Sequence, residues 1–223
     1  MSVVETVRIA PKILSVRALP RVDRQLAASL GCSEHHISVG MLTCDQDDAM
    51  YAALDHATKI ANVDVVYAKS FYAGSAHASG PYSGEVLGVI AGTDPDEVSE
   101  GIRAIRRSLA EEIAFHTFPG EKQPAFFAHV IASTGRYLSA EGKFEPGTPM
   151  AYVIAPPMES IVGLDAALKV APVRMARHFG PPTETNFGGG YLVGTLADVE
   201  AAARAFVDAV ADVAKRPLAH AVK

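Results

Sequence analysis

Hydrophobic and polar positions follow the same pattern twice along the chain. Short apolar runs predict strands, and apolar residues at three- and four-residue spacing predict helices. In the first half, strands are expected at 13–19, 37–43, 63–68 and 85–91, and helices at 23–30, 47–61 and 96–113. In the second half, strands are expected at 125–132, 150–155, 172–177 and 190–195, and helices at 135–141, 158–170 and 198–214. The common order predicts one structural unit used twice.

The closing helix of each half has one apolar stripe. In the first half, Pro95 lies beside Asp94, a residue that favours a helix start. The stripes are made by Val98, Ile102, Ile105 and Leu109, and by Val199, Ala203, Phe206 and Val210. Both helices are therefore expected to bury one face.

Direct sequence identity supports the repeat. Residues 54–63 and 164–173 are identical at six of ten positions with an offset of 110. The shared residues are Leu54, Asp55, Ala57, Lys59, Ala61 and Val63 with their counterparts. Strands mixed with helices in a β-α-β-β-α order are typical of a ferredoxin-like α+β unit. We predict domains at 1–117 and 124–223, joined by a segment rich in proline and glycine.

Composition narrows the function classes. The 223 residues are 49% apolar and 20% charged, which is typical of globular chains. The net charge is −5 and no basic block occurs, so no nucleic acid partner is expected. No uncharged apolar stretch of about 18 residues occurs, so no membrane partner is expected either. Two cysteines without a CxxC motif fit a reducing compartment.

Enzyme motifs are missing from the sequence. It contains no HExxH, no GxSxG, and no Lys-Ser/Thr after the Gly188–Gly190 run. We therefore expect no enzyme activity, no cofactor and no metal site. Symmetry-related copies of His77 or His178 meeting at a pore are the one open alternative for a metal.

The repeated Leu-Asp-x-Ala-x-Lys-x-Ala-x-Val helix, followed by a strand, resembles the bacterial microcompartment shell domain. Two such units, each opening with a strand and helix that other members carry at the end, resemble its circularly permuted tandem subgroup. Five further motifs are similar to the ethanolamine-utilization branch of that subgroup; they lie at 74–77, 84–87, 149–152, 155–157 and 181–186. The resemblance runs from about Ile13 to the C-terminal helix.

The resemblance implies an α+β fold of two tandem circularly permuted ferredoxin-like domains that form a pseudohexameric trimer. It implies a cytoplasmic structural tile that associates edge to edge with other shell proteins around enclosed enzymes. It also implies a central pore for metabolites, opened and closed by loops. A soluble trimeric small-molecule sensor that does not tile is the alternative.

The resemblance also implies a small acidic channel that binds an amino alcohol such as ethanolamine. Its residues are Asp47, Asp48, Glu85, Phe115 and Thr185. Carboxylates form charge-assisted hydrogen bonds to a primary ammonium, and an aromatic ring adds a cation–π contact. The other interpretation of Asp47 and Asp48 is first-turn acids that complement the helix dipole. At the offset of 110 the second half has Pro157 and Met158, so the fold itself does not require the acids.

Two long loops, 69–83 and 178–189, occupy equivalent places in the halves. They are either surface connections or the gate of the pore. The resemblance implies the gate, with Phe71, Tyr72, His77, Asn186, Phe187 and Gly189.

Lys59 and Lys169 end the two alanine-rich helices, where they complement the helix dipole. The resemblance implies that they also lie at the tile edge. The sequence departs from the ethanolamine-utilization branch at Ser79–Tyr82 and at the triple glycine Gly188–Gly190. The identity of the bound amine therefore stays open: it is ethanolamine, an aminopropanol or another small amine.

Overall fold

The structure, a computed structural model, describes residues 4–70, 84–181, 183 and 186–218. Its contacts divide the chain into two compact units, each described by itself. The first unit consists of Ala10–Ala114 and Thr134–Glu141; the second consists of Met1–Ile9, Phe115–Ser133 and Gly142–Lys223.

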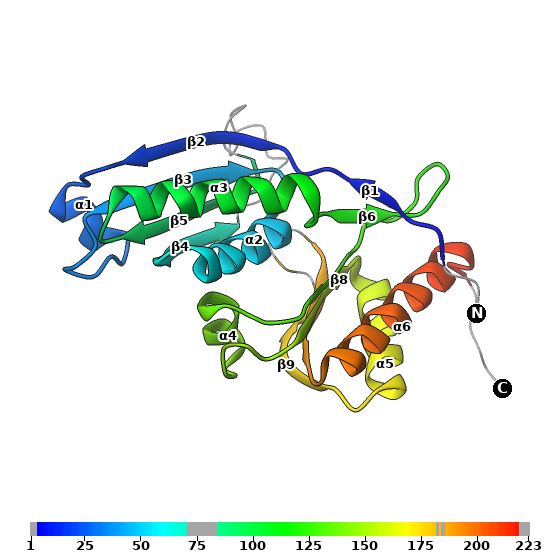
Figure 1. Cartoon of the computed structure of the whole chain (residues 1–223). Coiled ribbons are helices and arrows are strands. Elements are labelled where there is room, and N and C mark those ends of the chain that lie inside the picture. Colours follow the sequence, from blue (N-terminus) through cyan, green and yellow to red (C-terminus); the bar gives the residue numbers. More distant parts are fainter. Residues whose placement is uncertain (1–3, 71–83, 182, 184–185, 219–223) are drawn as a thin grey trace. The chain divides into compact units, whose positions relative to one another are not determined.

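The first unit is built on a four-stranded antiparallel sheet in the order β2-β3-β5-β4. Its strands are β2 (Ile13–Leu19), β3 (Ser38–Cys44), β4 (Val63–Ser70) and β5 (Val86–Gly92). Its helices are α1 (Arg24–Ser29), α2 (Asp47–Ile60) and α3 (Pro95–Glu111). The helices α2 and α3 pack on each other and on the sheet (Figure 1). The short helix α4 (Arg136–Gly142) completes this unit through residue 141.

The second unit repeats the plan with the sheet order β7-β8-β10-β9. Its strands are β7 (Phe127–Ile131), β8 (Met150–Ala155), β9 (Arg174–Phe179) and β10 (Gly188–Val193). The helices α5 (Pro157–Val170) and α6 (Leu196–Lys215) pack together beside this sheet. The repeated α+β architecture predicted from the sequence is confirmed.

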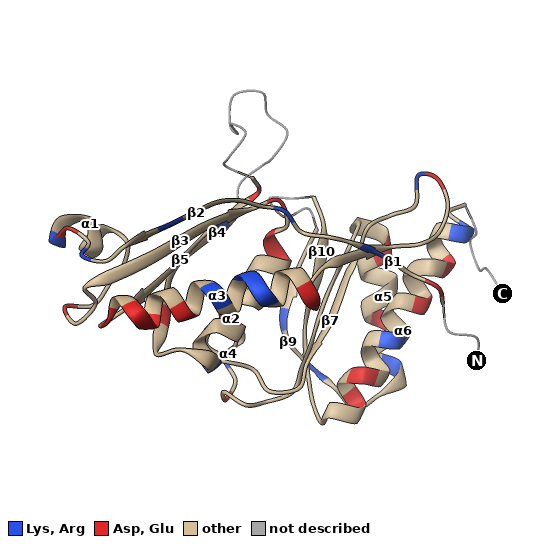
Figure 2. Cartoon of the chain, turned by 45° about the horizontal axis from the view of Figure 1, so that its top comes forward, with Lys and Arg blue, Asp and Glu red and all other residues tan. Residues whose placement is uncertain are grey.

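The apolar stripes of the two long helices are buried as predicted. All eight predicted stripe residues of α3 and α6 are buried. Asp94 caps α3 by accepting a hydrogen bond from the Asp96 N–H at 2.7 Å. The opposite face of α3 is charged and includes an ion pair between Arg103 and Glu100 at 2.6 Å (Figure 2).

A small two-stranded sheet was not predicted from the sequence. In it, β1 (Val7–Ile9) pairs antiparallel with β6 (Phe115–Thr117). Three residues are too few for alternation to signal a strand, which explains the omission. The contact-based units also differ from the predicted domains, because the N-terminal strand packs in the second unit and 134–141 in the first. The repeat boundaries 1–117 and 124–223 stay a prediction.

Candidate functional site

Asp47 and Asp48 lie in the first turn of α2, and both are buried. The Asp47 carboxylate accepts a hydrogen bond from the Ser70 hydroxyl at 2.9 Å and another from the Asp48 N–H at 2.8 Å. Burial raises the pKa of Asp47, and the hydrogen bond from Ser70 acts in the opposite direction. The Ser70 hydroxyl also hydrogen-bonds to the Tyr51 hydroxyl. Asp47 is thus a buried carboxyl held in place by the last residue of β4.

Glu85 is brought to the same end of the sheet by a tight backbone approach. Its N–H donates at 2.7 Å to the carbonyl of Cys44, the last residue of β3. The preceding Gly84 has φ +62°, and a Cβ there would lie 2.2 Å from the Cys44 carbonyl oxygen. Only glycine fits this position. Burial, followed by the charges of Asp47 and Asp45, raises the pKa of Glu85 to about 7.

We define the acidic group as Asp45, Asp47, Asp48 and Glu85. Asp45, whose carboxylate accepts the Lys12 backbone N–H at 2.7 Å, was not predicted from the sequence. Tyr51 and Ser70, which lie beside Asp47, were not predicted either. Burial raises the pKa of the Tyr51 hydroxyl, and the charges of Asp47 and Asp48 raise it further. The spacing from Asp47 to Tyr51, one helical turn, is the sequence signal that could have indicated this neighbour.

The arrangement favours a cation over an anion. Carboxyls whose pKa is raised by burial and by one another gain most from a positive charge placed among them. A primary ammonium offers three N–H donors and suits such a group. At the corresponding start of α5, the second unit has Pro157 and an exposed Met158 instead. The first unit alone has acids at both of these positions.

The other predicted ligand and gate residues that the structure describes belong to the second unit. Phe115 is buried, with its ring centroid 5.3 Å from Phe127 and 6.0 Å from Phe187. Asn186 has φ +64°, and its N–H donates to the Thr183 carbonyl at 3.0 Å. Phe187 therefore lies on an aromatic cluster of its own unit.

Gly189 lies inside β10, where it pairs with Ile154 of β8 and Phe179 of β9. This strand begins at Gly188, two residues before the predicted start. A Cβ at Gly189 would lie 1.9 Å from the Val153 carbonyl oxygen, so the glycine permits close strand packing. Phe71, Tyr72, His77 and Thr185 lie outside the described residues.

Lys59 and Lys169 are both exposed in the last turns of α2 and α5. The Lys169 ammonium forms an ion pair with Asp165, one turn earlier, at 2.6 Å. Exposed apolar residues follow the lysines, Ile60 and Val170. Equivalent ends of the two helices thus present the same kind of surface.

Within 4–70, 84–181, 183 and 186–218, no set of three or more His, Cys, Asp or Glu side chains, the acidic group included, is placed so that it could hold a metal ion. No helix among these same residues has the length and apolarity to cross a membrane.

Comparison with known proteins places the chain in a family. The bacterial microcompartment (BMC) domain matches residues 38–120. The shell protein EutL of Clostridium perfringens (strain 13 / Type A) is 43% identical over 210 residues, which cover 94% of this chain and 97% of that protein. EutL of Salmonella typhimurium (strain LT2) is 42% identical over 213 residues, 96% of this chain and 97% of that protein.

A solved structure shows the same fold over nearly the whole chain. The crystal structure of the ethanolamine utilization protein EutL from Leptotrichia buccalis matches with a TM-score of 0.93 and 45% identity, covering 97% of this chain and 100% of that one. The two units are thus BMC-type domains. The chain belongs to the EutL family of bacterial microcompartment shell proteins, and it is a structural component of such a shell rather than an enzyme.

Proposed function

We propose that the acidic group binds the ammonium of a small amino alcohol such as ethanolamine. The observation that carries this proposal is geometric: Ser70, which holds the buried Asp47 carboxylate at 2.9 Å, and Cys44, whose carbonyl accepts the Glu85 N–H at 2.7 Å, both pair with Val86 at one end of the sheet. The raised pKa of Glu85, caused by burial and by the charges of Asp47 and Asp45, agrees with this placement. A bound ammonium offsets the repulsion between these carboxylates. The relative of known structure named for ethanolamine utilization supports this choice of amine. The resemblance adds Phe115 and Thr185 as proposed contacts.

Calorimetric titration with ethanolamine tests the proposal. Asp47→Asn and Glu85→Gln each weaken binding, and the double variant abolishes it, because each change removes a charged acceptor. Sedimentation must show the same oligomer for all variants. Glu159→Gln is the matched control, since Glu159 is the first-turn acid of α5 in the second unit. Unchanged affinity in the double variant would exclude the acidic group as the binding site.

We also propose that the chain forms a homotrimer that imitates a hexamer and associates edge to edge with other shell proteins. Two units of one fold in each chain give six similar units in a trimer, a closed symmetric arrangement. The exposed Lys59 and Lys169, at equivalent helix ends, are the proposed edge contacts. The double variant Lys59→Glu, Lys169→Glu then keeps the trimer but forms no sheets in electron microscopy. Sheets that persist would remove the lysines from this role.

Sheet formation by the unmodified protein separates the tile from the sensor alternative. A trimer that never forms sheets, alone or with other shell proteins, would favour the sensor. A loop-gated central pore completes the proposal, with Phe71, Tyr72, His77, Asn186, Phe187 and Gly189 at the gate. Crystal structures obtained over several solution conditions and with ethanolamine should show more than one gate conformation. One invariant conformation would count against gating.

A further inference from the structure

The strand β4 lies at one edge of the sheet in the first unit. The sheet order β2-β3-β5-β4 places it at the end, and β5 is its only partner among the strands that the structure describes. An edge strand presents a row of backbone N–H and C=O groups on its free side. An extended peptide can add a further strand there through main-chain hydrogen bonds.

A groove of about 480 Å³ follows this edge strand. One wall is β4 itself, because six consecutive residues from Asp64 to Lys69 line the groove. The opposite wall is formed by α4, with Arg136, Tyr137, Ala140 and Glu141. All of these residues belong to the first unit. Six residues of strand extend over about 20 Å, so the groove has the length and the two walls that an extended peptide needs.

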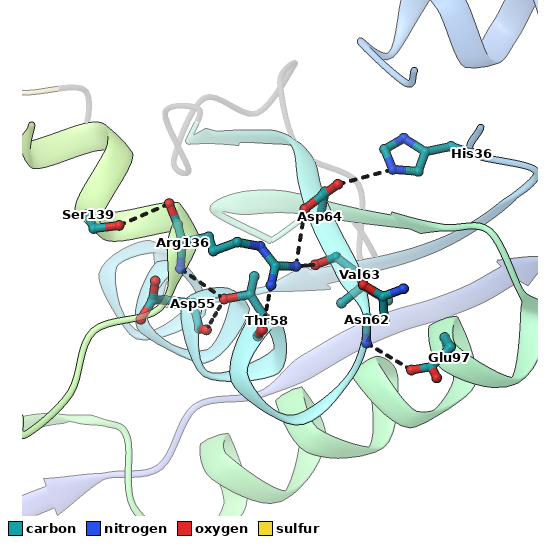
Figure 3. Close-up of polar contacts among 9 residues, drawn as sticks. All are labelled: His36, Asp55, Thr58, Asn62, Val63, Asp64, Glu97, Arg136 and Ser139. Atoms are coloured by element: carbon teal, nitrogen blue, oxygen red, sulfur yellow. Dashed lines mark hydrogen bonds and ion pairs between the residues drawn. The ribbon is translucent and has the colours of Figure 1, made fainter. Parts of the chain in front are cut away.

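The helix wall of the groove is held in place at both ends of β4. At the start of the strand, the Arg136 guanidinium donates to the Val63 carbonyl at 2.7 Å and forms an ion pair with Asp64 at 3.2 Å (Figure 3). At the other end, the ring centroid of Tyr137 lies 6.4 Å from that of Tyr51, whose hydroxyl hydrogen-bonds to the last residue of β4. A groove with fixed walls lowers the cost of ordering a bound peptide.

Only the last part of β4 is suited to strand addition. At its start, Arg136 already occupies the Val63 carbonyl. The register with β5 then shifts between Val65 and Tyr67, and a bulge of this kind blunts an edge against pairing. From Tyr67 to the end of the strand the register is continuous again. This last stretch is therefore where a partner strand would pair.

The charge of Lys69 in this stretch is not compensated by an ion pair. At the start of β4, Asp64 and Arg136 neutralise each other. Lys69 is exposed and forms no ion pair among the residues that the structure describes, Glu141 on the helix wall included. An Asp or Glu side chain of a partner would add a charge pair to the main-chain hydrogen bonds, and such complementarity favours one partner over others.

We propose that β4 and α4 form a docking site for an extended acidic segment of a partner protein. The segment adds a strand to the free edge of β4 and places an Asp or Glu side chain opposite Lys69. The half-buried rings of Tyr67 and Tyr137 line the same groove and offer apolar surface to the neighbouring side chains of the segment. The inference depends neither on amine binding by the acidic group nor on the homotrimer.

Fluorescence anisotropy of the full chain with a labelled synthetic peptide gives the first test. The probe is acetyl-Thr-Val-Thr-Glu-Thr-Val-Thr-amide, and it should bind saturably. The same peptide with its central residues N-methylated lacks the N–H donors for strand pairing and should bind about tenfold more weakly. Absence of saturable binding up to millimolar peptide, or equal binding of the two peptides, would overturn the proposal.

Charge exchange locates the bound peptide. Lys69→Glu should weaken binding of the Glu peptide about fivefold, and a peptide with Lys in place of Glu should regain that loss on the variant. Arg17→Glu is the matched control, since Arg17 is an exposed basic residue of β2, the other edge strand of the same sheet. Its affinity should be unchanged. Equal effects of the two substitutions would show that the peptide responds only to overall charge.

Filling the groove gives a test that is independent of charge. Ala140→Trp places a large side chain in the groove from α4 and should weaken binding about tenfold or more, whereas Ala110→Trp, at an exposed position of α3, should not. Hydrogen exchange of the unmodified chain should show protection of the amides of Tyr67–Lys69 when the peptide is bound. Full binding by Ala140→Trp refutes the site. If Ala140→Trp instead changes the sedimentation of the chain without peptide, a second copy occupies the edge, and the peptide proposal is wrong.

Discussion

The Asp55 carboxylate and the Gly135 N–H lie 2.6 Å apart although 80 residues separate them in the chain. The helix α4 lacks a capping side chain at Gly135, and Asp55 of α2 supplies the acceptor instead. Figure 3 labels Asp55 beside Arg136, the first residue of α4. An acid at the N-terminus of a helix also complements its dipole. One aspartate thus fixes both the start of α4 and its place on α2.

Asp55→Ala should strongly destabilise the protein. The substitution leaves the buried N–H groups of Gly135 and Leu138 without their acceptor, at a cost of about 1–3 kcal/mol for each unsatisfied group. Denaturant unfolding at fixed protein concentration measures the loss. Asp165→Ala is the matched control: its exposed carboxylate pairs only with exposed Lys169 among the contacts described, so a change below about 1 kcal/mol is expected. Equal losses in both variants would show that the cap is unimportant.

Gly135→Ala should destabilise the protein by a steric route. A Cβ would lie 2.4 Å from the Thr58 hydroxyl oxygen and 2.5 Å from the Asp55 carbonyl oxygen, so α4 has to move away from α2. Overpacking of this kind costs about 1–3 kcal/mol. Gly180→Ala serves as the control, because among the residues that the structure describes its Cβ would meet only the His178 ring, at 3.8 Å. A Gly135→Ala protein as stable as Gly180→Ala would contradict the close packing of α4.

Ethanolamine binding should strengthen as the pH rises through 7. The pKa of Glu85, about 7 in the folded protein, lies above its ordinary value of 4.5, so Glu85 is mostly neutral at pH 6. If the ammonium needs the carboxylate, affinity at pH 6 is about tenfold lower than at pH 8. The same shift makes the folded state bind more protons than the unfolded state between these pKa values. The contribution of Glu85 to stability is therefore full below pH 4.5 and is lost as the pH rises through 7.

Calorimetry at pH 6, 7 and 8 measures the affinity, and Glu85→Gln is the control. That variant should bind more weakly at pH 8 and change less over the range, because it has no carboxyl at this position. A pH profile equally steep in both proteins would assign the titration to another group.

Sequence patterns were sufficient to predict the helices and strands that bury one face. They were insufficient where a single side-chain contact determines the role of a residue. The stripe from Val98 to Leu109 gives α3 its buried face, and the repeat of Leu54–Val63 in Leu164–Val173 shows the doubled fold. The same repeat shows Asp55 and Asp165 as equal, yet one is a buried cap and the other an exposed partner of Lys169. That difference depends on a helix 80 residues away, which no local pattern encodes.

The residues of the candidate site also fall into two groups, those that the sequence identifies and those that it does not. Asp47, Asp48 and Glu85 were identified through a family resemblance and through the absence of the paired acids from the second repeat. Ser70 could not be identified, because no sequence pattern around the last residue of β4 indicates a contact with Asp47, 23 residues earlier. Side-chain partners in the site follow from the antiparallel sheet and its register, and these form only in the folded chain.

Ser70→Ala should weaken ethanolamine binding by acting on Asp47. The Ser70 hydroxyl donates to the Asp47 carboxylate at 2.9 Å and lowers its pKa against the effect of burial. Without this bond the pKa of Asp47 rises, its ionised fraction near pH 7 falls, and the carboxylate is held less firmly. The loss of one hydrogen bond corresponds to an affinity reduction of about 2- to 12-fold.

Tyr51→Phe separates this effect from a general loosening of the site. It removes the hydroxyl that contacts Ser70 but leaves the bond from Ser70 to Asp47, so its affinity should change less than that of Ser70→Ala. Ser70→Thr keeps the hydroxyl and should retain most of the binding. Titration of the three variants with ethanolamine at pH 7 gives the order of affinities. If Ser70→Ala binds as tightly as the unmodified protein, Asp47 does not contact the ammonium.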